Sequence, residues 1–349
     1  MMDTLNLSYD RYKRSLLIWL FSGCFLVFGM VVVGGITRLT GSGLSITEWK
    51  VVTGTIPPLN ETQWMAEFEK YKQIPQYQQL NSHFTLSDFK FIFFWEYIHR
   101  LFGRLIGVVF MIGFVFFYVK KAIPKHLMPK LLFMFVLGGI QGFLGWYMVS
   151  SGLTQNVRVS HIRLAIHLTF AFITFGYIFK VALGEIYTKL ADNGQGVTKF
   201  RQAAIVLLVL VTLQIIYGAF VAGSHAGMVY NTWPKMGDEW VPESVGFALE
   251  KDGASSLINN VASLQFIHRM MAYFITLYVL VLGYKIYNNG TSALKKAVVM
   301  LEVGILLQVV LGITTLLLQV PMWLGVLHQA VAFFLFAGCI YLVHRLRYS

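Results

Sequence analysis

The sequence predicts an all-α membrane protein with eight transmembrane helices. They form two tandem four-helix bundles related by a pseudo-two-fold axis along the membrane normal. The chain has 349 residues, of which 56% are hydrophobic and only 13% charged, about half the charged fraction of a soluble domain. Its apolar residues gather in runs long enough to cross a bilayer, and its two halves share motifs in the same order. These observations exclude a cytosolic enzyme, a disordered chain and a nucleic-acid-binding protein.

Apolar runs of about 20 residues define the expected transmembrane helices. They lie at residues 16–36, 92–119, 130–150, 162–183, 202–222, 264–285, 297–318 and 323–343. The first run is too long for a cleaved signal peptide, and no small-residue cleavage site follows it. In the first long connection, residues 61–73 predict a short amphipathic helix after Pro57 and Pro58.

Basic residues predict the orientation, because cytoplasmic loops are rich in Lys and Arg. Much of the net charge of +12 comes from the two ends of the chain and from the short connections between spans. The long connections 37–91 and 223–263 balance their lysines with acidic residues. We therefore expect a multi-pass protein of the bacterial inner membrane, with both termini in the cytoplasm and both long connections outside.

An internal repeat predicts two four-helix units, at residues 1–190 and 191–349. The run Glu96-Tyr97-Ile98-His99-Arg100 begins the second span, and Gln265-Phe266-Ile267-His268-Arg269 begins the sixth. Because each unit has an even number of spans, the two copies are parallel. Three spans also share a Gln-x-x-x-Gly motif, at Gln141/Gly145, Gln214/Gly218 and Gln308/Gly312. We interpret this motif, which the first span lacks, as a helix-packing device.

Four histidines lie at one expected depth near the outer ends of the even-numbered spans. They are His99, His167, His268 and His328. Each lies about 8–12 Å past its helix entrance at 1.5 Å per residue, where a strongly polar group is costly and indicates function. A single histidine there would suggest only an interhelical hydrogen bond. Four of them, two in each half, leave a metal site, a proton relay and heme ligation as alternatives.

The neighbouring residues favour heme ligation among these alternatives. A zinc or copper site would favour closely spaced Cys, Asp or Glu ligands, and a proton relay needs buried carboxylates, of which the spans have few. Single histidines on separate helices suit two hemes, each held between two helices of a bundle. Heme propionates need cations at the membrane edge, and an arginine binds a carboxylate bidentately. The candidates are Arg100, Arg104, Arg163 and Arg269, for which snorkelling to the headgroups is the alternative.

Glu96 distinguishes the two halves. It precedes His99 by three residues and so shares its helix face, whereas the corresponding residue before His268 is Gln265. A carboxylate partly withdrawn from water acts as an acid or base. We therefore predict that the first half performs chemistry and that the second half holds a permanent electron-transfer heme. The alternative is that Glu96 merely pairs with a neighbouring arginine.

Several motifs resemble those of the heme A synthase family. They are Gly34-Gly35-Ile36-Thr37-Arg38-Leu39-Thr40-Gly41-Ser42-Gly43-Leu44-Ser45 followed by Thr47-Glu48-Trp49, Glu96-Tyr97-Ile98-His99-Arg100, Arg163-Leu164-Ala165 with His167, Tyr230-Asn231-Thr232-Trp233-Pro234, and Leu327-His328-Gln329. The resemblance spans nearly the whole chain. Members of that family are eight-helix membrane enzymes that convert heme O to heme A for terminal oxidases, by oxidising the C8 methyl group to a formyl group through hydroxylation.

The resemblance also implies roles for individual residues. His268 and His328 would ligate a heme b cofactor, His99 and His167 would hold the substrate heme, and Glu96 would be the essential glutamate. Some bacterial members have a cysteine pair in the first outer loop, which this sequence lacks. It is therefore more similar to the branch of the mitochondrial and many Gram-negative enzymes.

The same residues and resemblance suggest partners for the protein and a competing function. A quinone is one candidate electron acceptor, heme O synthase is a candidate protein partner, and a homo-oligomer is a further expectation. The competing function is a diheme b-type cytochrome that passes electrons between quinol and a partner. His161 is expected to be a surface or propionate contact, and His225 has no interpretation.

Overall fold

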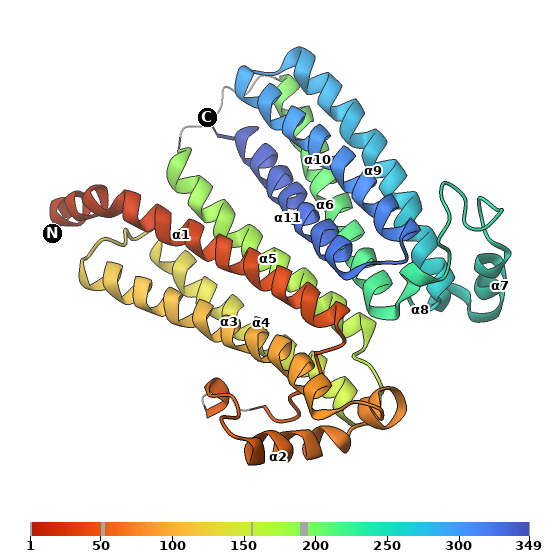
Figure 1. Ribbon diagram of the computed structural model, residues 1–349. Helices are drawn as coiled ribbons and strands as arrows, with labels where there is room; N and C mark the ends of the chain where they lie inside the picture. The colour runs from red at the N-terminus through yellow and green to blue at the C-terminus, as the bar shows by residue number, and fades with distance from the viewer. Residues whose placement is uncertain (1, 50–52, 155, 189–194, 349) are drawn as a thin grey trace. The chain divides into compact units, whose positions relative to one another are not determined.

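The computed structural model describes residues 2–49, 53–154, 156–188 and 195–348, and within these ranges the regular structure is helical apart from one isolated bridge (Figure 1). Eight helices are long and apolar enough to cross a membrane. They are α1 (Met2–Leu39), α3 (Leu86–Val119), α4 (Met128–Thr154), α5 (His161–Ile186), α6 (Gln195–Ser224), α9 (Val261–Asn289), α10 (Ser292–Leu317) and α11 (Met322–Arg345). All eight expected spans are therefore confirmed, and the chain is a multi-pass membrane protein.

Polar caps explain why two of these helices begin before their apolar runs. Thr85 and Asp88 form a capping box at the start of α3, where each side chain accepts from the other residue's backbone N–H. At the start of α9, the side chain of Asn260 accepts from the N–H groups of Ala262 and Ser263. These caps satisfy N–H groups that have no partner within the helix. Farther along, the helix itself pairs the backbone, which a bilayer demands.

The described residues form two compact units, and the residues of α5 are shared between them. The first contains the chain up to Arg163 together with Ile173–Ala182, and the second contains Leu164–Phe172 and the chain from Leu183 onward. The predicted boundary at residue 190 lies outside the described residues. The division at that point and the pseudo-two-fold axis both stay predictions.

The second unit contains a closed four-helix bundle. Helix α6 packs on α9 and α11, and α10 also packs on α9 and α11 (Figure 1). Each helix thus has two close neighbours, and side chains such as Leu207, Ile275 and Leu301 are buried among them. Two short helices of the connection after α6 pack at the start of α9, namely α7 (Glu243–Asp252) and α8 (Ser256–Asn259). The sequence analysis did not predict these two.

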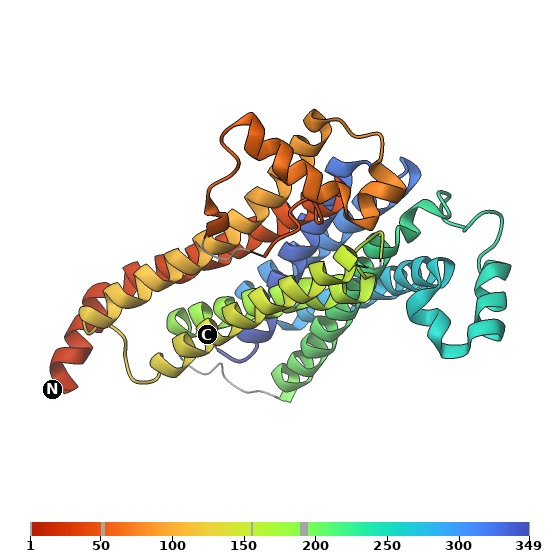
Figure 2. The same cartoon turned by 90° about the horizontal axis from the view of Figure 1, so that it is seen from below.

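In the first unit, α1 runs along α3 (Figures 1 and 2). Glycines permit the close approach, as is usual between membrane helices. Gly29 faces the ring of Phe102, and Gly113 faces the indole of Trp19. The Trp19 indole N–H also donates to the backbone carbonyl of Val109 at 3.3 Å. Glycines on both helices therefore determine how closely α1 and α3 approach each other.

The connection between α1 and α3 has a hydrophobic core of its own. It contains α2 (Glu61–Lys72), which confirms the predicted amphipathic helix, and Figure 2 shows the connection gathered at one end of α1 and α3. Phe68 and Tyr71 of α2 are buried against Phe89 of α3, with the Phe68 and Phe89 ring centroids 5.0 Å apart. Leu44, from the segment after α1, joins the same cluster. This connection is a packed cover over one end of the helix pair.

Candidate functional site

His99 lies on α3 where that helix approaches α1 at a glycine. A Cβ atom at Gly34 would lie 3.2 Å from Cε1 and 3.6 Å from Nδ1 of His99. That separation is shorter than an ordinary van der Waals contact between carbon atoms. Glycine at position 34 therefore leaves room for the imidazole beside the backbone of α1.

The same arrangement of glycine and histidine occurs twice in the second unit. A Cβ at Gly218 of α6 would lie 3.2 Å from Cε1 of His268, and one at Gly312 of α10 would lie 3.0 Å from Cε1 of His328. These glycines are the last residues of two Gln-x-x-x-Gly motifs. The sequence predicts these motifs to be helix-packing devices. In the structure, the glycine of each motif packs against a histidine ring.

The glutamines of these two motifs contact the same histidines. The amide nitrogen of Gln214 donates to the backbone carbonyl of His268 at 3.0 Å and lies 3.5 Å from its ring atom Nε2. The amide nitrogen of Gln308 lies 3.2 Å from Nε2 of His328. Sequence reasoning missed this role, although the recurrence of the motif on helices next to the histidine-bearing spans was a signal for it.

His268 lies on α9 and His328 on α11, two helices of one bundle. Both rings are half-buried, and their Nδ1 atoms are buried without a hydrogen-bond partner. A buried ring nitrogen that lacks a partner is costly unless another group uses the ring. Both histidines therefore lie in the bundle expected for them, and their joint ligation of one heme stays a prediction.

Glu96 lies on α3 one turn before His99 and is almost completely buried, with 3% of its side chain exposed. Its Oε2 accepts hydrogen bonds from the Ser45 hydroxyl at 2.7 Å and from the Ile46 N–H at 2.8 Å. Its Oε1 accepts from Nη2 of Arg100 at 2.7 Å and from Nε at 3.1 Å. The carboxylate is therefore held both by an ion pair and by the connection after α1.

Arg100 completes this attachment. Its Nη1 donates to the carbonyl of Glu48 and its Nη2 to the carbonyl of Ile46, both at 2.9 Å. The guanidinium also lies over the Trp49 ring, 4.9 Å from its centroid. The ion pair named as an alternative role for Glu96 is present. In this structure the Arg100 donors bond Glu96 and the connection between α1 and α3, and the predicted propionate contact stays a prediction.

In the second unit, Arg269 likewise bonds the connection that precedes its helix. Its Nη2 donates to the carbonyl of Tyr230 at 2.7 Å, and its Nη1 donates to the carbonyls of Thr232 and Lys235. Gln265, the counterpart of Glu96, donates from its amide to the same Tyr230 carbonyl at 3.0 Å. Both residues are buried. The pair thus holds the connection between α6 and α9 to the start of α9.

The other predicted site residues lie on the helices expected for them. Arg163 donates to the Tyr147 carbonyl at 2.8 Å and lies over the ring of that tyrosine. Arg104 lies on α3 one turn after Arg100, and His167 lies on α5. The pairing of His99 with His167 and the propionate contacts of these arginines stay predictions.

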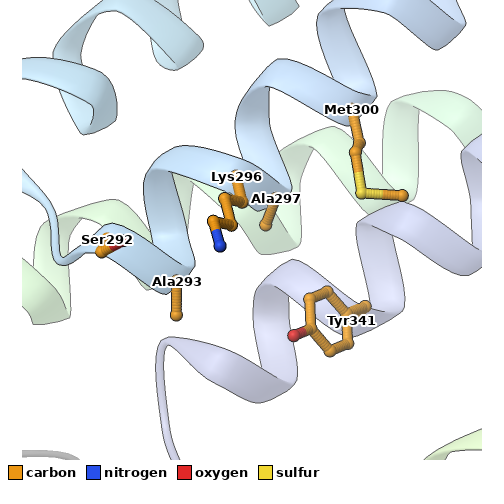
Figure 3. A pocket seen from close by; sticks show the side chains of 6 residues that line it. All are labelled: Ser292, Ala293, Lys296, Ala297, Met300 and Tyr341. Atoms are coloured by element: carbon orange, nitrogen blue, oxygen red, sulfur yellow. The ribbon is translucent and has the colours of Figure 1, made fainter.

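An open pocket of about 500 Å³ lies away from the histidines, between the start of α10 and the end of α11. Figure 3 shows Lys296 and Tyr341 facing it. Tyr341 is about 20 Å along α11 from His328 at 1.5 Å per residue. This pocket is therefore separate from the histidine site of that bundle.

Comparison with known proteins identifies close relatives. A family model described as cytochrome oxidase assembly protein matches residues 17–340. The chain is 48% identical to a protein named heme A synthase from Flavobacterium psychrophilum and 47% identical to one from Flavobacterium johnsoniae, over 96% of this chain and 99% of each relative. It is 45% identical to the heme A synthase of Rhodospirillum centenum, over 96% of this chain and 89% of that relative.

Proposed function

The chain belongs to the cytochrome oxidase assembly protein family, and we propose that it is a heme A synthase. It oxidises the C8 methyl group of heme O to the formyl group of heme A, which terminal oxidases require. The observation that carries this proposal is the high identity to proteins of that name over nearly the whole chain. A diheme cytochrome that only passes electrons is not favoured by these relatives.

The residues of the second unit fit a resident heme b. His268 and His328 offer two imidazoles within one bundle, and each has a buried Nδ1 without a hydrogen-bond partner. Gly218 and Gly312 leave room for these rings, because a Cβ at either position would lie 3.0–3.2 Å from the Cε1 atom of the facing histidine. Bis-histidine ligation between helices is a common way to hold heme in a bundle. When bound, this heme supplies one-electron transfer for the oxidation.

The first unit carries out the chemistry on the substrate heme O. His99 and His167 hold the substrate, and Glu96 lies one turn from His99 on the same helix. Oxidation of the methyl group to a hydroxymethyl group, with an oxygen atom from water, and then to a formyl group releases two protons with each pair of electrons, and the electrons pass to the acceptor. Glu96 is the buried carboxylate on this helix that accepts a proton, and Arg100 and the Ser45 hydroxyl fix the orientation of its two oxygens.

Proton uptake at Glu96 also affects the outer connection. Protonation would weaken the ion pair between Oε1 and Arg100, and it would weaken the bonds that Oε2 accepts from Ser45 and Ile46. Hydrogen bonds to a charged acceptor are stronger than those to a neutral one. The proton state of Glu96 is therefore linked to the attachment of the connection that covers this end of α3.

We also propose a membrane location and partners for the protein. The protein lies in the bacterial inner membrane with both termini in the cytoplasm, as the distribution of Lys and Arg supports. Heme O synthase supplies the substrate directly, a quinone takes the electrons, and the protein forms a homo-oligomer. The four arginines near the outer helix ends bind propionates.

Expression in a bacterial host that makes heme O but not heme A tests the activity. Extracted hemes are separated by chromatography, and we expect heme A only in cells that express the chain. Absence of heme A, with the protein present in the membrane at normal amounts, would refute the proposed activity. For the cofactor site, His268→Ala should remove the low-spin heme b spectrum of the purified protein.

A further inference from the structure

The pocket between α10 and α11 lies where both spans end, at the boundary of the membrane. Its lining residues are Ser292, Ala293, Lys296, Ala297, Met300 and Tyr341. Ser292 is the first residue of α10, and Tyr341 lies four residues before the end of α11. Lys296 is therefore about 6 Å into its helix at 1.5 Å per residue. The headgroup region on each side of a bilayer is ~5–8 Å thick, so the pocket lies at the depth of lipid headgroups.

Lys296 brings an unpaired positive charge to this pocket. Within the described part of the chain, its ammonium group has no hydrogen bond, ion pair or aromatic ring as a partner. Figure 3 shows Lys296 directed from α10 into the space that Tyr341 borders from α11. Because the side chain is exposed, an anion from outside the protein can reach this ammonium group.

Neither helix supplies a carboxylate to neutralise the charge. Glu302 is the acidic residue of α10, and its carboxylate lies against Gly283 of α9 rather than in the pocket. Helix α11 has no acidic residue between Met322 and Arg345. Arg345 follows Tyr341 by one turn on the same face, and its Nε and Nη1 atoms are buried without a hydrogen-bond partner. The charge at this end of the two helices therefore favours an anionic ligand.

Exposed apolar side chains continue from the pocket toward the middle of both helices. On α10, Met300, Val303 and Leu307 follow Lys296 at helical spacing, and on α11 Phe334 lies two turns before Tyr341. All four are exposed, and Met300 has 75% of its surface free. The site thus has a cationic end at headgroup depth and an apolar strip that leads away from it. A phospholipid has the complementary arrangement of charge and acyl chains.

We propose that this pocket binds an anionic phospholipid of the phosphatidylglycerol type. Basic pockets between transmembrane helices commonly bind such headgroups. Lys296 bonds the phosphate, Arg345 adds positive charge beside it, and the acyl chains follow the apolar strip. The site is independent of the proposed heme chemistry, because it lies about 20 Å along α11 from His328. A lipid bound here contacts both α10 and α11 and so stabilises the folded bundle.

Native mass spectrometry of the purified full-length chain in detergent measures lipid binding directly. With dioleoyl phosphatidylglycerol as the probe, Lys296→Gln should weaken binding about fivefold, as loss of one basic residue near the membrane surface predicts. Lys295→Gln is the matched control, because it removes the same charge from the same helical turn. The Lys295 ammonium group lies over the Tyr287 ring, 5.3 Å from its centroid, and does not line the pocket. Equal affinities in these two variants would overturn the proposal.

A second variant separates the pocket from general attraction to a basic surface. Ala293→Trp keeps every charge and fills the pocket with an indole ring, so we expect it to weaken phosphatidylglycerol binding at least tenfold. Phosphatidylglycerol should raise the unfolding temperature of the parent chain and of Lys295→Gln, and it should raise that of Lys296→Gln less. Binding by Ala293→Trp as tight as that of the parent chain contradicts the proposal. If Ala293→Trp does not fold, the comparison of the two lysine variants decides the question.

The source of the phosphate is tested with two further probes. Dioleoyl phosphatidylcholine has the same acyl chains and no net charge, and it should bind at least fivefold more weakly than phosphatidylglycerol. Inorganic phosphate in large excess should not displace phosphatidylglycerol, because it has no acyl chains to place on the apolar strip. Equal binding of the two lipids would overturn the assignment of an anionic ligand. Displacement by inorganic phosphate would show that the pocket binds the free anion and would overturn the assignment of a lipid.

Discussion

The starts of α3 and α9 are each attached to the connection that precedes the helix, but partly by different residues. In both, the arginine directly after the histidine donates to backbone carbonyls of the connection that precedes the helix. Three residues before the histidine, Glu96 accepts hydrogen bonds from that connection, whereas Gln265 donates one to it. The amide of Gln265 achieves the attachment without a charge. A carboxylate at position 96 is therefore not required for anchoring, which supports a chemical role for it.

The helix packing of the two units can also be compared. In the second unit, α6, α9, α10 and α11 form a closed bundle. In the first unit α1 packs closely on α3, and contacts between aromatic rings join α3 to α4, α4 to α5 and α1 to α5. Variants at matching positions of the two units test whether their sites have different roles.

The largest expected effect is that of Glu96→Gln, which gives the first unit the residue of the second. Heme A formation should fall by about 100-fold or more, since general acid–base groups typically contribute 10²–10⁴-fold. The heme b content of the purified protein should stay unchanged. Chromatography of extracted hemes measures both quantities. A normal yield of heme A would show that Glu96 only anchors the connection.

Arg100→Ala should destabilise the protein by about 3 kcal/mol, because it leaves the buried Glu96 carboxylate without its cation. Arg269→Ala should cost less, because its neighbour Gln265 is neutral. Thermal unfolding of the purified protein in detergent measures the difference. Equal losses of stability in the two variants would contradict the proposed difference between the anchors.

Gly312→Ala should weaken heme b binding about tenfold, because the added Cβ would lie 3.0 Å from Cε1 of His328 and must displace the ring. Gly34→Ala should leave heme b unchanged and affect only the first site. Heme b content after dialysis against apomyoglobin distinguishes the two. Equal loss of heme b in both variants would argue against separate sites.

The smallest expected effect concerns the connection between α1 and α3. Tyr71→Phe removes a buried hydroxyl that bonds Gln76 at 3.1 Å and Asn81 at 2.7 Å. It should cost about 1 kcal/mol, and it should increase protease cleavage within residues 53–85 without changing heme b content. Burial raises the pKa of Tyr71 to about 12, so this contact should not titrate below pH 10. Equal cleavage rates in variant and parent would show that the hydroxyl does not stabilise the connection.

The membrane class, the eight spans and the amphipathic helix of the first connection could all be predicted from the sequence. Each of these depends on local hydrophobicity and polar caps, because a helix in a bilayer must satisfy its own backbone. The sequence also singled out His268, His328 and Glu96, since polar groups in apolar runs are costly and conspicuous.

The atoms that these side chains contact could not be predicted from the sequence and are known from the packing of the helices. The donors of Arg100 are directed to carbonyls about fifty residues earlier in the chain, and Gln214 contacts a histidine on another helix. The spacing of Gln and Gly revealed a shared helix face but not the ring opposite it. Such contacts depend on how separate helices approach each other, and local sequence patterns do not specify that approach.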